Sequence, residues 1–324
     1  MHAIRIEKTG GPEVLAYQDT PQPTPKNGEL LVKVGACGVN FIDVYYRTGL
    51  YKAELPLTIG LEGAGTVSAV GPGVSEFKAG DRVAWAAAMG SYAEYAIVPA
   101  AKAVSLPAGI DDRLGAAIML QGMTAAYLSA GTYPIARGDS VLVHAGAGGV
   151  GLLLTQMAKH RGARVITTVS TEDKAQLSRG AGADEVILYT QQDFEAETKR
   201  LTDGKGVACV YDSVGVTTFE KSLNVLRPLG YLVLFGASSG PVPPFDLSQL
   251  AKGSLFITRP TLFTYIAERA NLLKYANAVF SGISEGWLKI RTEHFYPLAE
   301  AEQAHRDLEA RKTTGKLILL PSST

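Results

Sequence analysis

The chain has 324 residues, 46% of them hydrophobic, and its 31 Lys and Arg are balanced by 31 Asp and Glu. This length is enough for two domains that each bury a core. Zero net charge argues against broad electrostatic capture of nucleic acid or an anionic membrane, and no apolar run approaches a membrane span. With two cysteines, Cys37 and Cys209, and no signal-peptide pattern at residues 1–7, we expect a protein of the reducing cytoplasm.

The first third of the sequence predicts β-structure. Short runs such as residues 29–34, 65–70 and 92–98 are bounded by Gly and Pro turns, as strands are. From about residue 111 an Ala-rich segment with acidic residues at its start predicts a helix.

A regular alternation of strands and helices follows, and it predicts a doubly wound parallel sheet. The strand candidates are residues 140–144, 164–169, 185–188, 208–212, 231–235 and 254–258. Helices are expected at about residues 265–282 and at residues 300–311. The apolar segment 317–320 predicts a last strand, which we expect to return to the N-terminal domain.

Gly146, Gly148 and Gly151 form a G-x-G-x-x-G motif between an apolar run at 141–143 and a helical pattern at 152–159. This strand–loop–helix context indicates a dinucleotide site rather than a turn without a ligand. We expect Gly146 to permit the tight turn, Gly148 to let the backbone approach a pyrophosphate, and Gly151 to let the helix pack closely. The helix N-terminus would then offer N–H groups to the phosphates.

The second strand of the alternation ends at Val169 without the acid that usually accepts a hydrogen bond from the adenosine 2′-hydroxyl. Glu172 and Asp173 follow in the first turn of the next helix, where the helix dipole favours acids. Lys174 lies in the same turn, where a cation is disfavoured unless it binds a phosphate, and Ser170 could bond that phosphate. We therefore favour NADPH over NADH. The alternative is a capping box of Ser170 and Asp173 with Lys174 solvated.

Seven segments of the chain are familiar in combination. They are GGPEVL at 10–15, GVNFIDVYYRTG at 38–49, GLEGAG at 60–65, QGMTA at 121–125, HAGAGGVG at 144–151, YDSVG at 211–215 and FGASSG at 235–240. Together they resemble the zinc-independent quinone oxidoreductases of the medium-chain dehydrogenase/reductase superfamily, the zeta-crystallin-like group. The resemblance covers nearly the whole chain.

The resemblance implies an α/β protein with a GroES-like, β-rich catalytic domain and a Rossmann domain with a doubly wound parallel sheet. The first domain would span residues 1–120 and be completed by about 290–324, and the second would span 121–289. The resemblance also implies reduction of a small-molecule quinone by NADPH, and a homodimer formed through the Rossmann domain.

Site residues follow from the same resemblance. It places Asn40, Asp43 and Tyr45 at the catalytic cleft, with Asn40 and Tyr45 also touching the cofactor. The remaining expected cofactor contacts are Thr124 near the nicotinamide, Gly146, Ala147, Gly148, Gly149 and Val150 around the pyrophosphate, Ser170, Lys174 and Tyr189 around the 2′-phosphate, Phe235, Ala237 and Ser238 on the nicotinamide side, and Arg311 and Lys316 near the C-terminus. For Tyr189 a half-buried aromatic at a strand end is the alternative, and for Arg311 a cation that closes a helix.

The sequence predicts no metal site. Zinc-dependent alcohol dehydrogenases of the same superfamily hold a catalytic zinc with Cys, His and a third Cys or acid. Cys37 stands at the first ligand position, but Leu61 replaces the His between Gly60 and Glu62, and leucine cannot ligate a metal. The two cysteines of the chain also exclude a four-cysteine structural zinc lobe.

A quinone needs no Lewis acid because it is strongly electrophilic, so the expected chemistry is hydride transfer with the protein supplying proximity and orientation. Tyr45 could donate a hydrogen bond to the developing hydroquinone oxygen, with Asn40 and Asp43 orienting it; the alternative for Tyr45 is aromatic packing. A reductase of α,β-unsaturated carbonyls would share all these features. A non-catalytic crystallin-like or RNA-binding role is the third possibility, which the balanced charge weakens.

Overall fold

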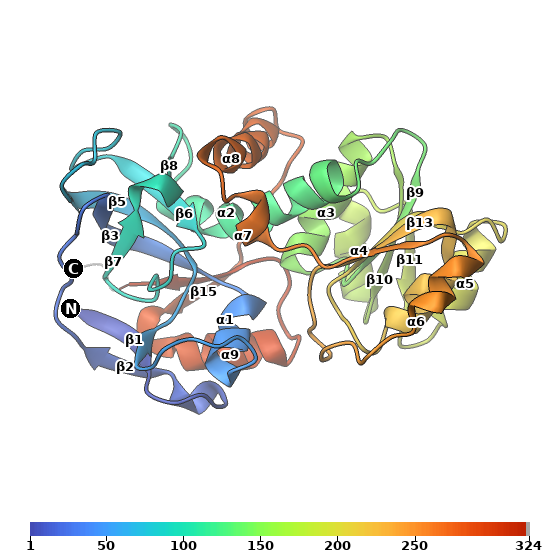
Figure 1. Ribbon diagram of the computed structural model, residues 1–324, viewed down its shortest axis with the longest axis horizontal. Coiled ribbons are helices and arrows are strands. Elements are labelled where there is room, and N and C mark those ends of the chain that lie inside the picture. The colour runs from blue at the N-terminus through green and yellow to red at the C-terminus, as the bar shows by residue number, and fades with distance from the viewer. Residues whose placement is uncertain (322–324) are drawn as a thin grey trace. The chain divides into compact units, whose positions relative to one another are not determined.

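The computed structural model describes residues 1–321 and contains two compact units (Figure 1). The first unit comprises Met1–Met123, Ile266–Phe280 and residues 290–321, and the second comprises Thr124–Tyr265 and Ser281–Lys289. Two helices, α2 (Asp112–Tyr127) and α8 (Arg269–Ser284), each contribute residues to both units. No helix in residues 1–321 is long and apolar enough to span a membrane.

The first unit is built on a seven-stranded sheet in which β15, β16, β3, β5, β6 and β8 are neighbours in that order and β7 also pairs with β3. Its strands are β3 (Glu29–Val39), β5 (Glu62–Val70), β6 (Arg82–Ala86), β7 (Tyr95–Pro99), β8 (Ala103–Ser105), β15 (His294–Pro297) and β16 (Leu317–Leu320). The smaller sheet contains β1 (His2–Ile6), β2 (Ala16–Asp19) and β4 (Leu57–Thr58). The helical elements are α1 (Phe41–Thr48), α9 (Ala301–Glu309) and the 3₁₀ turns η1 (Pro12–Val14), η2 (Ala100–Lys102) and η5 (Leu298–Glu300).

Close cross-strand packing fixes the register of this sheet. Gly63 of β5 is opposite Trp85 of β6, and Trp85 is fully buried. A Cβ at Gly63 would lie 2.6 Å from the indole, so the glycine makes room for the largest side chain of the core. The last strand, β16, pairs antiparallel with β3, where Leu319 is opposite Cys37. The C-terminal segment therefore completes the sheet that the first hundred residues begin.

The second unit is a six-stranded parallel sheet in the order β11-β10-β9-β12-β13-β14. The strands are β9 (Ser140–His144), β10 (Arg164–Val169), β11 (Glu185–Leu188), β12 (Val207–Asp212), β13 (Leu226–Leu234) and β14 (Phe256–Thr258). The helical elements are α3 (Gly149–His160), α4 (Glu172–Gly180), α5 (Phe194–Leu201), α6 (Phe219–Asn224), α7 (Leu262–Tyr265), the π-helix η3 (Leu128–Thr132) and the 3₁₀ turn η4 (Leu247–Lys252). Numbered within the unit, the order is 3-2-1-4-5-6, the Rossmann arrangement.

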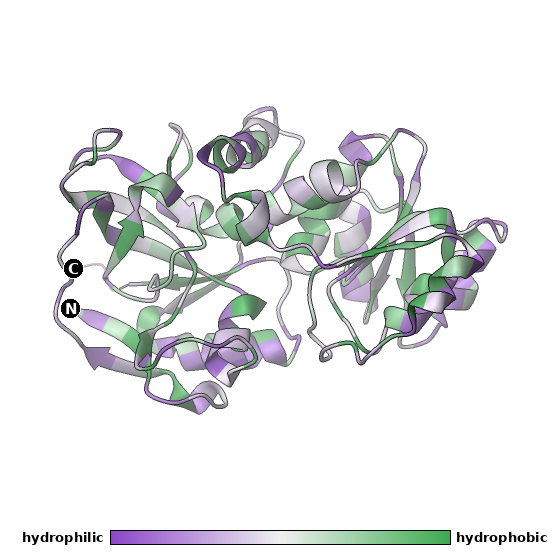
Figure 2. Ribbon diagram, viewed as in Figure 1, coloured by the Kyte–Doolittle hydropathy of each residue, from purple (hydrophilic) through white to green (hydrophobic). Residues whose placement is uncertain are grey.

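The core of the second unit lies along the middle of this sheet. Figure 2 shows hydrophobic residues along its strands and a mixture of hydrophobic and hydrophilic residues on its helices. Leu142, Ile166, Val210 and Leu232 of four successive strands in the sheet are all fully buried in one cluster. Strands buried on both faces have this continuous apolar character, whereas helices cover the sheet with one apolar side.

Most predicted elements of the second unit are confirmed. Strands at 140–144, 164–169 and 185–188 have the predicted bounds, and β12 begins one residue before the prediction. Others differ: β13 begins at Leu226 rather than 231, β14 begins at Phe256 rather than 254, and α3 begins at Gly149 rather than 152. The predicted helix at 265–282 is divided into α7 and α8, and the one at 300–311 ends at Glu309.

Candidate cofactor and catalytic sites

The glycine loop joins β9 to α3 and begins with a residue in a rare conformation. Ala145 has a φ of 53°, the left-handed region, whereas Gly146 does not lie there. The turn therefore does not require the left-handed region at Gly146. Gly146 lets the turn pack closely, because a Cβ there would lie 2.6 Å from the Cβ of Thr167 and 2.8 Å from the Ser178 hydroxyl oxygen.

The next two glycines have different surroundings. A Cβ at Gly151 would collide with the carbonyl oxygen of Ala145, so α3 can pack this closely against the loop only without a side chain there. At Gly148, which caps α3, a Cβ would meet only that same oxygen, at 3.2 Å, among the described residues. The space that a side chain would fill at Gly148 is thus beside the N-terminus of a twelve-residue helix, where N–H groups and the helix dipole favour an anion.

The other expected pyrophosphate residues surround this position. Gly149 and Val150 form the first turn of α3, and Ala147 is buried against Val169 and Ala175. The residues present fit the pyrophosphate of a dinucleotide: they provide backbone N–H groups and no side chain that would fill its place.

Two residues expected at the adenosine end are brought together by strand register. Val169 of β10 is paired with Leu188 of β11, so Ser170 and Tyr189 leave neighbouring parallel strands at the same edge of the sheet. The Tyr189 side chain is 41% exposed, and Thr190 Oγ1 donates a hydrogen bond of 2.9 Å to the Ser170 carbonyl oxygen. Because this edge is the carboxyl edge, it is where such sheets bind nucleotides.

Lys174 follows in the first turn of α4, and the cap of that helix differs from the alternative that the sequence left open. Thr171, not Ser170, is the N-cap, and its hydroxyl accepts a hydrogen bond of 3.4 Å from the Lys174 backbone N–H. The capping box of Ser170 and Asp173 is therefore wrong. Ser170 does not cap the N-terminus of α4, which is compatible with a role in ligand binding.

The loops after β12 and β13 are tied to each other. The Asp212 carboxylate accepts hydrogen bonds from the N–H groups of Val214 at 2.7 Å and Gly215 at 3.1 Å, which shapes the turn after β12. The Ser213 carbonyl oxygen, which lies in this turn, accepts a hydrogen bond of 3.1 Å from the Ser238 N–H. Sequence reasoning missed Asp212, although an Asp that ends a strand before Ser-Val-Gly is a recognisable turn signal.

The loop that carries Phe235, Ala237 and Ser238 is therefore held against the turn after β12. Phe235 N–H donates a hydrogen bond of 2.9 Å to the Asp212 carbonyl oxygen, and the Arg259 guanidinium donates one of 2.6 Å to the Gly236 carbonyl oxygen. Ala237 is buried, whereas Phe235 and Ser238 are half-buried. Their expected contact with the nicotinamide stays a prediction.

In the first unit, Asn40 and Asp43 meet at the start of α1. Asn40 is the N-cap, and its backbone N–H donates a hydrogen bond of 2.8 Å to Asp43 Oδ2. The Asp43 N–H in turn donates one of 3.0 Å to the Asn40 carbonyl oxygen. Both residues are buried, at 3% and 0% exposure. Their expected place at the catalytic cleft, where they would orient Tyr45, stays a prediction.

A hydrogen-bonded chain leads from Asp43 to α9. Tyr92 Oη lies 3.0 Å from Asp43 Oδ2 and 3.2 Å from His305 Nε2, and His305 Nδ1 lies 3.0 Å from an Arg47 nitrogen. Arg47 also forms a two-pronged ion pair with Glu309, at 2.7 and 2.8 Å. Because arginine only donates, His305 accepts at Nδ1 and carries its proton on Nε2, so Tyr92 accepts from His305 and donates to Asp43.

Burial controls the charge of this chain. Burial raises the pKa of Asp43 to about 7, although the hydrogen bonds from Asn40 and Tyr92 and the charge of Lys316 lower it. Burial and the neighbouring Arg47 lower the pKa of His305 to about 3, so its imidazole is neutral. Sequence reasoning missed Tyr92, Arg47 and His305, which come from three distant segments.

Tyr45 lies on α1 among aromatic side chains. Its ring is half-buried and is 5.3 Å from the ring of Tyr51 and 6.4 Å from that of Phe41. The backbone N–H of Tyr51 donates a hydrogen bond of 3.0 Å to the Tyr45 carbonyl oxygen, which ties the following loop to the helix. Unlike Asn40 and Asp43, Tyr45 is therefore the residue of the predicted catalytic group that is accessible to a ligand.

The remaining expected contacts are in different environments. Lys316 is 1% exposed and forms an ion pair with Glu62 inside the first unit, and its expected cofactor contact stays a prediction. Arg311 is exposed and closes α9: its φ is 57°, its N–H donates a hydrogen bond of 3.1 Å to the Leu308 carbonyl oxygen, and the Lys312 N–H donates one of 3.2 Å to that of Asp307. Thr124 lies in the last part of α2 and is 7% exposed.

The positions of zinc ligands hold other chemistry here. Cys37 Sγ donates a hydrogen bond of 2.7 Å to the Ser91 carbonyl oxygen, and burial raises the pKa of the thiol well above its usual range. Leu61 is 3% exposed and packs in the interior. Across residues 1–321, no group of three His, Cys, Asp or Glu side chains could hold a metal ion.

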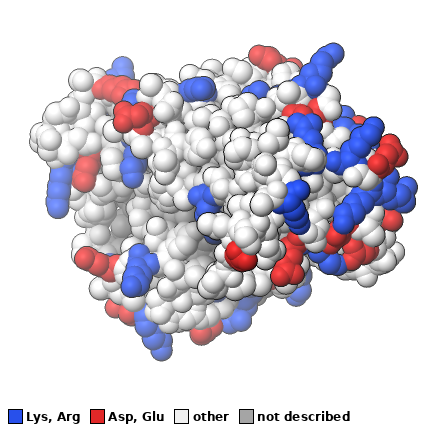
Figure 3. All heavy atoms as spheres, turned by 45° about the vertical axis from the view of Figure 1, so that its right-hand side comes forward, with Lys and Arg blue, Asp and Glu red and all other residues white. Residues whose placement is uncertain are grey.

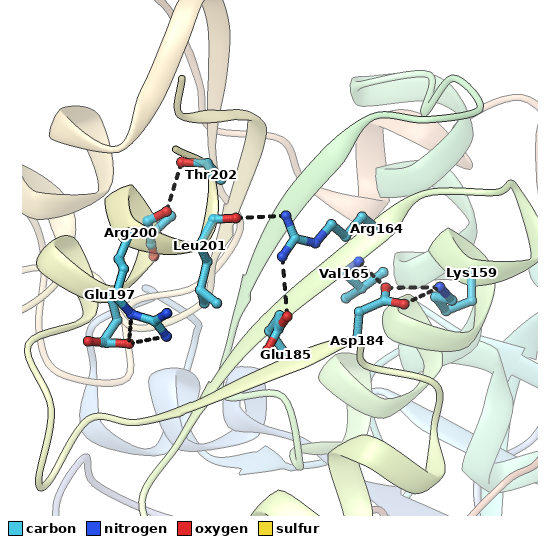
Figure 4. Close-up of polar contacts among 10 residues, drawn as sticks. Lys159, Arg164, Val165, Asp184, Glu185, Glu197, Arg200, Leu201 and Thr202 are labelled. Atoms are coloured by element: carbon cyan, nitrogen blue, oxygen red, sulfur yellow. Dashed lines mark hydrogen bonds and ion pairs between the residues drawn. The ribbon is translucent and has the colours of Figure 1, made fainter. Parts of the chain in front are cut away.

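Seven basic side chains of the second unit form ion pairs with acids. Figure 3 shows Lys and Arg interspersed with Asp and Glu on the face of this unit that it presents. Near the amino ends of β10 and β11, three basic side chains each contact an acid, as Figure 4 shows. These pairs are Lys159–Asp184 at 2.8 Å, Arg164–Glu185 at 3.2 Å and Arg200–Glu197 at 2.8 Å. These ion pairs offset the positive charge of the three basic side chains, and RNA binding depends on such charge.

Two family models match the chain. Residues 26–108 match the alcohol dehydrogenase GroES-like domain, and residues 149–276 match the zinc-binding dehydrogenase domain. The name of the second model refers to zinc, but this chain has Leu61, between Gly60 and Glu62, where zinc-dependent members have a histidine ligand.

Full-length relatives agree with these matches. A quinone oxidoreductase of Pseudomonas aeruginosa is 47% identical and covers 98% of this chain and 99% of its own length. A 2-haloacrylate reductase of a Burkholderia species is 40% identical over 99% of both chains. The solved structure of a mycobacterial protein complexed with NADPH has a TM-score of 0.97 and 51% identity, and covers 99% of this chain and 100% of its own. The fold, the glycine loop and these relatives show that the chain belongs to the zinc-independent quinone oxidoreductases of the medium-chain dehydrogenase/reductase superfamily.

Proposed function

We propose that this protein reduces quinones with NADPH and without zinc. The observation that carries the proposal is the place at Gly148, where the N-terminus of α3 has room for an anion. At the carboxyl edge of the same sheet, Ser170 follows β10, Tyr189 follows β11, and Lys174 lies in the first turn of α4. β10 ends without the acid that would bind the adenosine 2′-hydroxyl of NADH. The quinone as acceptor is supported by the 47% identical relative named quinone oxidoreductase.

When bound, NADPH supplies the hydride that a quinone accepts. The chain itself binds the cofactor by the loop from Gly146 to Val150 and orients the acceptor, which needs no metal because the quinone is already electrophilic. Tyr45 is the candidate hydrogen-bond donor to the developing hydroquinone oxygen, since it is the accessible member of the α1 group.

A reductase of α,β-unsaturated carbonyls is the second candidate, favoured by the 40% identical 2-haloacrylate reductase. The two functions share fold and cofactor and differ in the acceptor. The test is NADPH oxidation, with NADH in parallel, against 1,4-benzoquinone, 9,10-phenanthrenequinone, an enone and an aldehyde. Fast oxidation with the quinones alone supports the proposal. Turnover of the enone with little quinone activity establishes the second candidate, and no turnover despite tight NADPH binding rejects both.

The Lys174→Ala variant should raise the KM for NADPH by about tenfold or more, because a charge-assisted bond to a phosphate contributes roughly 1.5–3 kcal/mol. The KM for NADH, which lacks the 2′-phosphate, should stay unchanged. Lys199→Ala is the matched control, since Lys199 lies in the same unit and pairs with Glu195. Equal effects on the two cofactors, or a preference of the unmodified protein for NADH, would show that Lys174 does not recognise the phosphate.

The protein is proposed to form a homodimer through the second unit. β14 is the edge strand of the six-stranded sheet, and its Phe256 is 45% exposed and stacked at 4.5 Å on Tyr231. Leu229 and Leu247, in the segments next to β14, are 63% and 72% exposed. An open strand edge with exposed apolar side chains is suited to pairing with a second copy.

A Phe256→Asp variant should therefore run as a monomer in light scattering coupled to size exclusion, whereas the unmodified protein runs as a dimer. The physical reason is that an aspartate carboxylate would lose hydration at the paired edge. Phe295→Asp is the matched control, because Phe295 is 40% exposed on β15, an edge strand of the first unit. A monomeric unmodified protein, or a dimer that survives Phe256→Asp, would place the interface elsewhere or remove it.

A cytoplasmic location is proposed from the thiols. Cys37 and Cys209 are both free and both buried in strands. Free buried thiols are typical of proteins that fold in a reducing compartment.

A further inference from the structure

Glu62 is the centre of a buried polar cluster in the first unit. Its Oε1 accepts a hydrogen bond of 2.6 Å from the backbone N–H of Leu120, inside α2. Its Oε2 accepts one of 2.9 Å from the Asn40 side-chain amide and forms an ion pair of 2.5 Å with Lys316 Nζ. One carboxylate thus contacts α2, the residue before α1, and the residue before β16.

The Asn40 amide is fully used within this cluster. Its Nδ2 donates to Glu62 and, at 3.3 Å, to the Gly38 carbonyl oxygen. Its Oδ1 accepts from Lys316 Nζ at 2.7 Å and from the Gln121 side chain at 3.2 Å. These four contacts use both amide hydrogens and both lone pairs of the oxygen, so the Asn40 side chain is committed to this cluster.

The cluster is closely packed around Gly38. A Cβ at Gly38 would collide with Glu62 Oε2 and with the Ala116 carbonyl oxygen, and it would lie 2.8 Å from Lys316 Cε. The side chains of Glu62 and Lys316 are 0% and 2% exposed. Burial lowers the pKa of Lys316, and the charge and hydrogen bond of Glu62 oppose that effect. Two charges this deep are tolerated because each is paired and hydrogen-bonded.

The elements that meet at Glu62 carry site residues of the proposed reaction. Asn40 caps α1, and Tyr45 lies on that helix, little more than one turn from the cap. Leu120 and Gln121 lie one turn before Thr124 on α2. A shift of Glu62 would therefore move the cap of α1 and change its register with α2.

We propose that Glu62 and Lys316 are positioning residues of the reductase: they hold the start of α1, and with it Tyr45, in register with α2. The inference rests on the proposed function for its catalytic consequence, while its structural part can be measured without turnover. Neither residue touches the acceptor; both act through Asn40 and the backbone of α2.

The experiment compares Lys316→Met, Glu62→Gln and the double variant with the unmodified protein. Lys316→Met leaves a buried carboxylate without its ion pair. The double variant removes both charges and keeps the oxygen that accepts from the Leu120 N–H; its new amide NH2 can replace Lys316 Nζ as the donor to Asn40 Oδ1 once the Asn40 amide turns over. Removing one partner of a buried pair is far more disruptive than replacing both, so the double variant should recover most of what Lys316→Met loses. If Lys316→Met does not accumulate as folded protein, Glu62→Gln takes its place as the variant that breaks the ion pair by removing one charge.

Hydrogen exchange provides the first readout. In Lys316→Met, amides of residues 43–49 should exchange about tenfold faster than in the unmodified protein, because the capped start of α1 has lost its support. Peptides from the glycine loop, 145–152, should exchange unchanged. Unchanged exchange in α1 overturns the inference whatever the acceptor of the enzyme is.

Turnover provides the second readout, with 1,4-benzoquinone as the acceptor and rates divided by the number of NADPH-binding sites found by titration. In Lys316→Met, kcat per site should fall about tenfold to a hundredfold, since small misplacement near the reacting groups has effects of this size. The dissociation constant for NADPH should change less than about twofold, because the pyrophosphate loop is untouched. The double variant should return kcat to within about threefold of the unmodified protein.

The matched control is Arg82→Met. Arg82 pairs with Asp112 at 2.7 Å and so also joins a strand of this sheet to α2, but at the start of the helix. It should lower thermal stability and leave kcat per site unchanged. If Lys316→Met behaves like Arg82→Met, with lower stability and unchanged kcat per site, Glu62 and Lys316 are structural only and the inference is wrong. If the unmodified protein reduces no quinone, the proposed function fails, and exchange in α1 alone decides the ordering role.

Discussion

A Gly148→Ala variant should fold as the unmodified protein does and bind NADPH about a hundredfold more weakly, or not at all. The expectation follows from the surroundings of the cap of α3: the nearest atom to the new methyl group would be the Ala145 carbonyl oxygen at 3.2 Å, a contact that small backbone shifts relieve. The methyl group would instead occupy the place proposed for the pyrophosphate. Losing close backbone contacts to a dinucleotide phosphate removes several charge-assisted hydrogen bonds, each of about 1.5–3 kcal/mol.

Gly151→Ala should behave differently, because its methyl group would collide with the Ala145 backbone rather than with a ligand. The start of α3 would have to move away from the loop, which should cost about 1–3 kcal/mol of folding free energy and also weaken NADPH binding. Gly180→Ala is the matched control: Gly180 ends α4, and outside the adjoining helix backbone no atom of residues 1–321 lies within 4 Å of its added Cβ. It should leave binding unchanged and stability equal or slightly higher.

Isothermal titration with NADPH and thermal unfolding separate these outcomes. The pattern expected is loss of binding alone at residue 148, loss of binding and stability at residue 151, and neither at residue 180. Normal NADPH affinity in Gly148→Ala would mean that the cofactor does not approach the backbone there, and the assignment of the glycine loop would be wrong.

The second unit was predictable from sequence because its signals are local. A buried parallel strand is a continuous apolar run, and β9, β10 and β11 have the bounds that those runs predict. The glycine fingerprint is also local, and it correctly located the loop between β9 and α3. The close packing that requires a glycine at residue 146 was not predictable in this way, because it comes from Thr167 and Ser178 on other elements, which the motif does not contain.

The first unit shows what local patterns miss. Asn40 and Asp43 were found by resemblance, but their burial depends on Glu62, Tyr92, Lys316 and His305, four residues dispersed over most of the sequence. No periodicity relates a lysine before the last strand to an asparagine before the first helix. Only the pairing of β16 with β3 brings Lys316 beside Asn40.

The same buried chain should make stability depend on pH in a way that two variants can separate. The pKa of Asp43 is raised by burial to about 7, so between its unfolded value of about 4 and 7 the folded state binds the proton more tightly. The contribution of Asp43 to the free energy of unfolding is therefore full below about pH 4 and is lost as pH rises to about 7. His305 has the opposite sign: its pKa is lowered to about 3 by burial and by Arg47, so its contribution is lost as pH falls from about 6.5 to 3.

Asp43→Asn keeps an acceptor for the Asn40 N–H and the Tyr92 hydroxyl but has no charge to bury. Relative to the unmodified protein, it should gain about 2–4 kcal/mol in free energy of unfolding between about pH 5 and pH 8, as expected for a shift of about three pKa units reduced for relaxation around the site. His305→Gln can still accept from Arg47 and donate to Tyr92. Its free energy of unfolding, relative to that of the unmodified protein, should rise by a similar amount as pH falls from about 6.5 to 4.

Urea unfolding of each variant beside the unmodified protein, at intervals from about pH 4 to pH 8, measures these differences. Because every other titrating group is common to the proteins compared, the change in relative stability with pH isolates the replaced side chain. Glu54→Gln, which removes an exposed carboxylate from the same unit, is the control and should show little change. If Asp43→Asn tracks the unmodified protein across this range, Asp43 is ionised near its ordinary pKa in the folded state. The folded protein would then hold a buried, charged carboxylate at Asp43, hydrogen-bonded to Tyr92, although burial disfavours that charge.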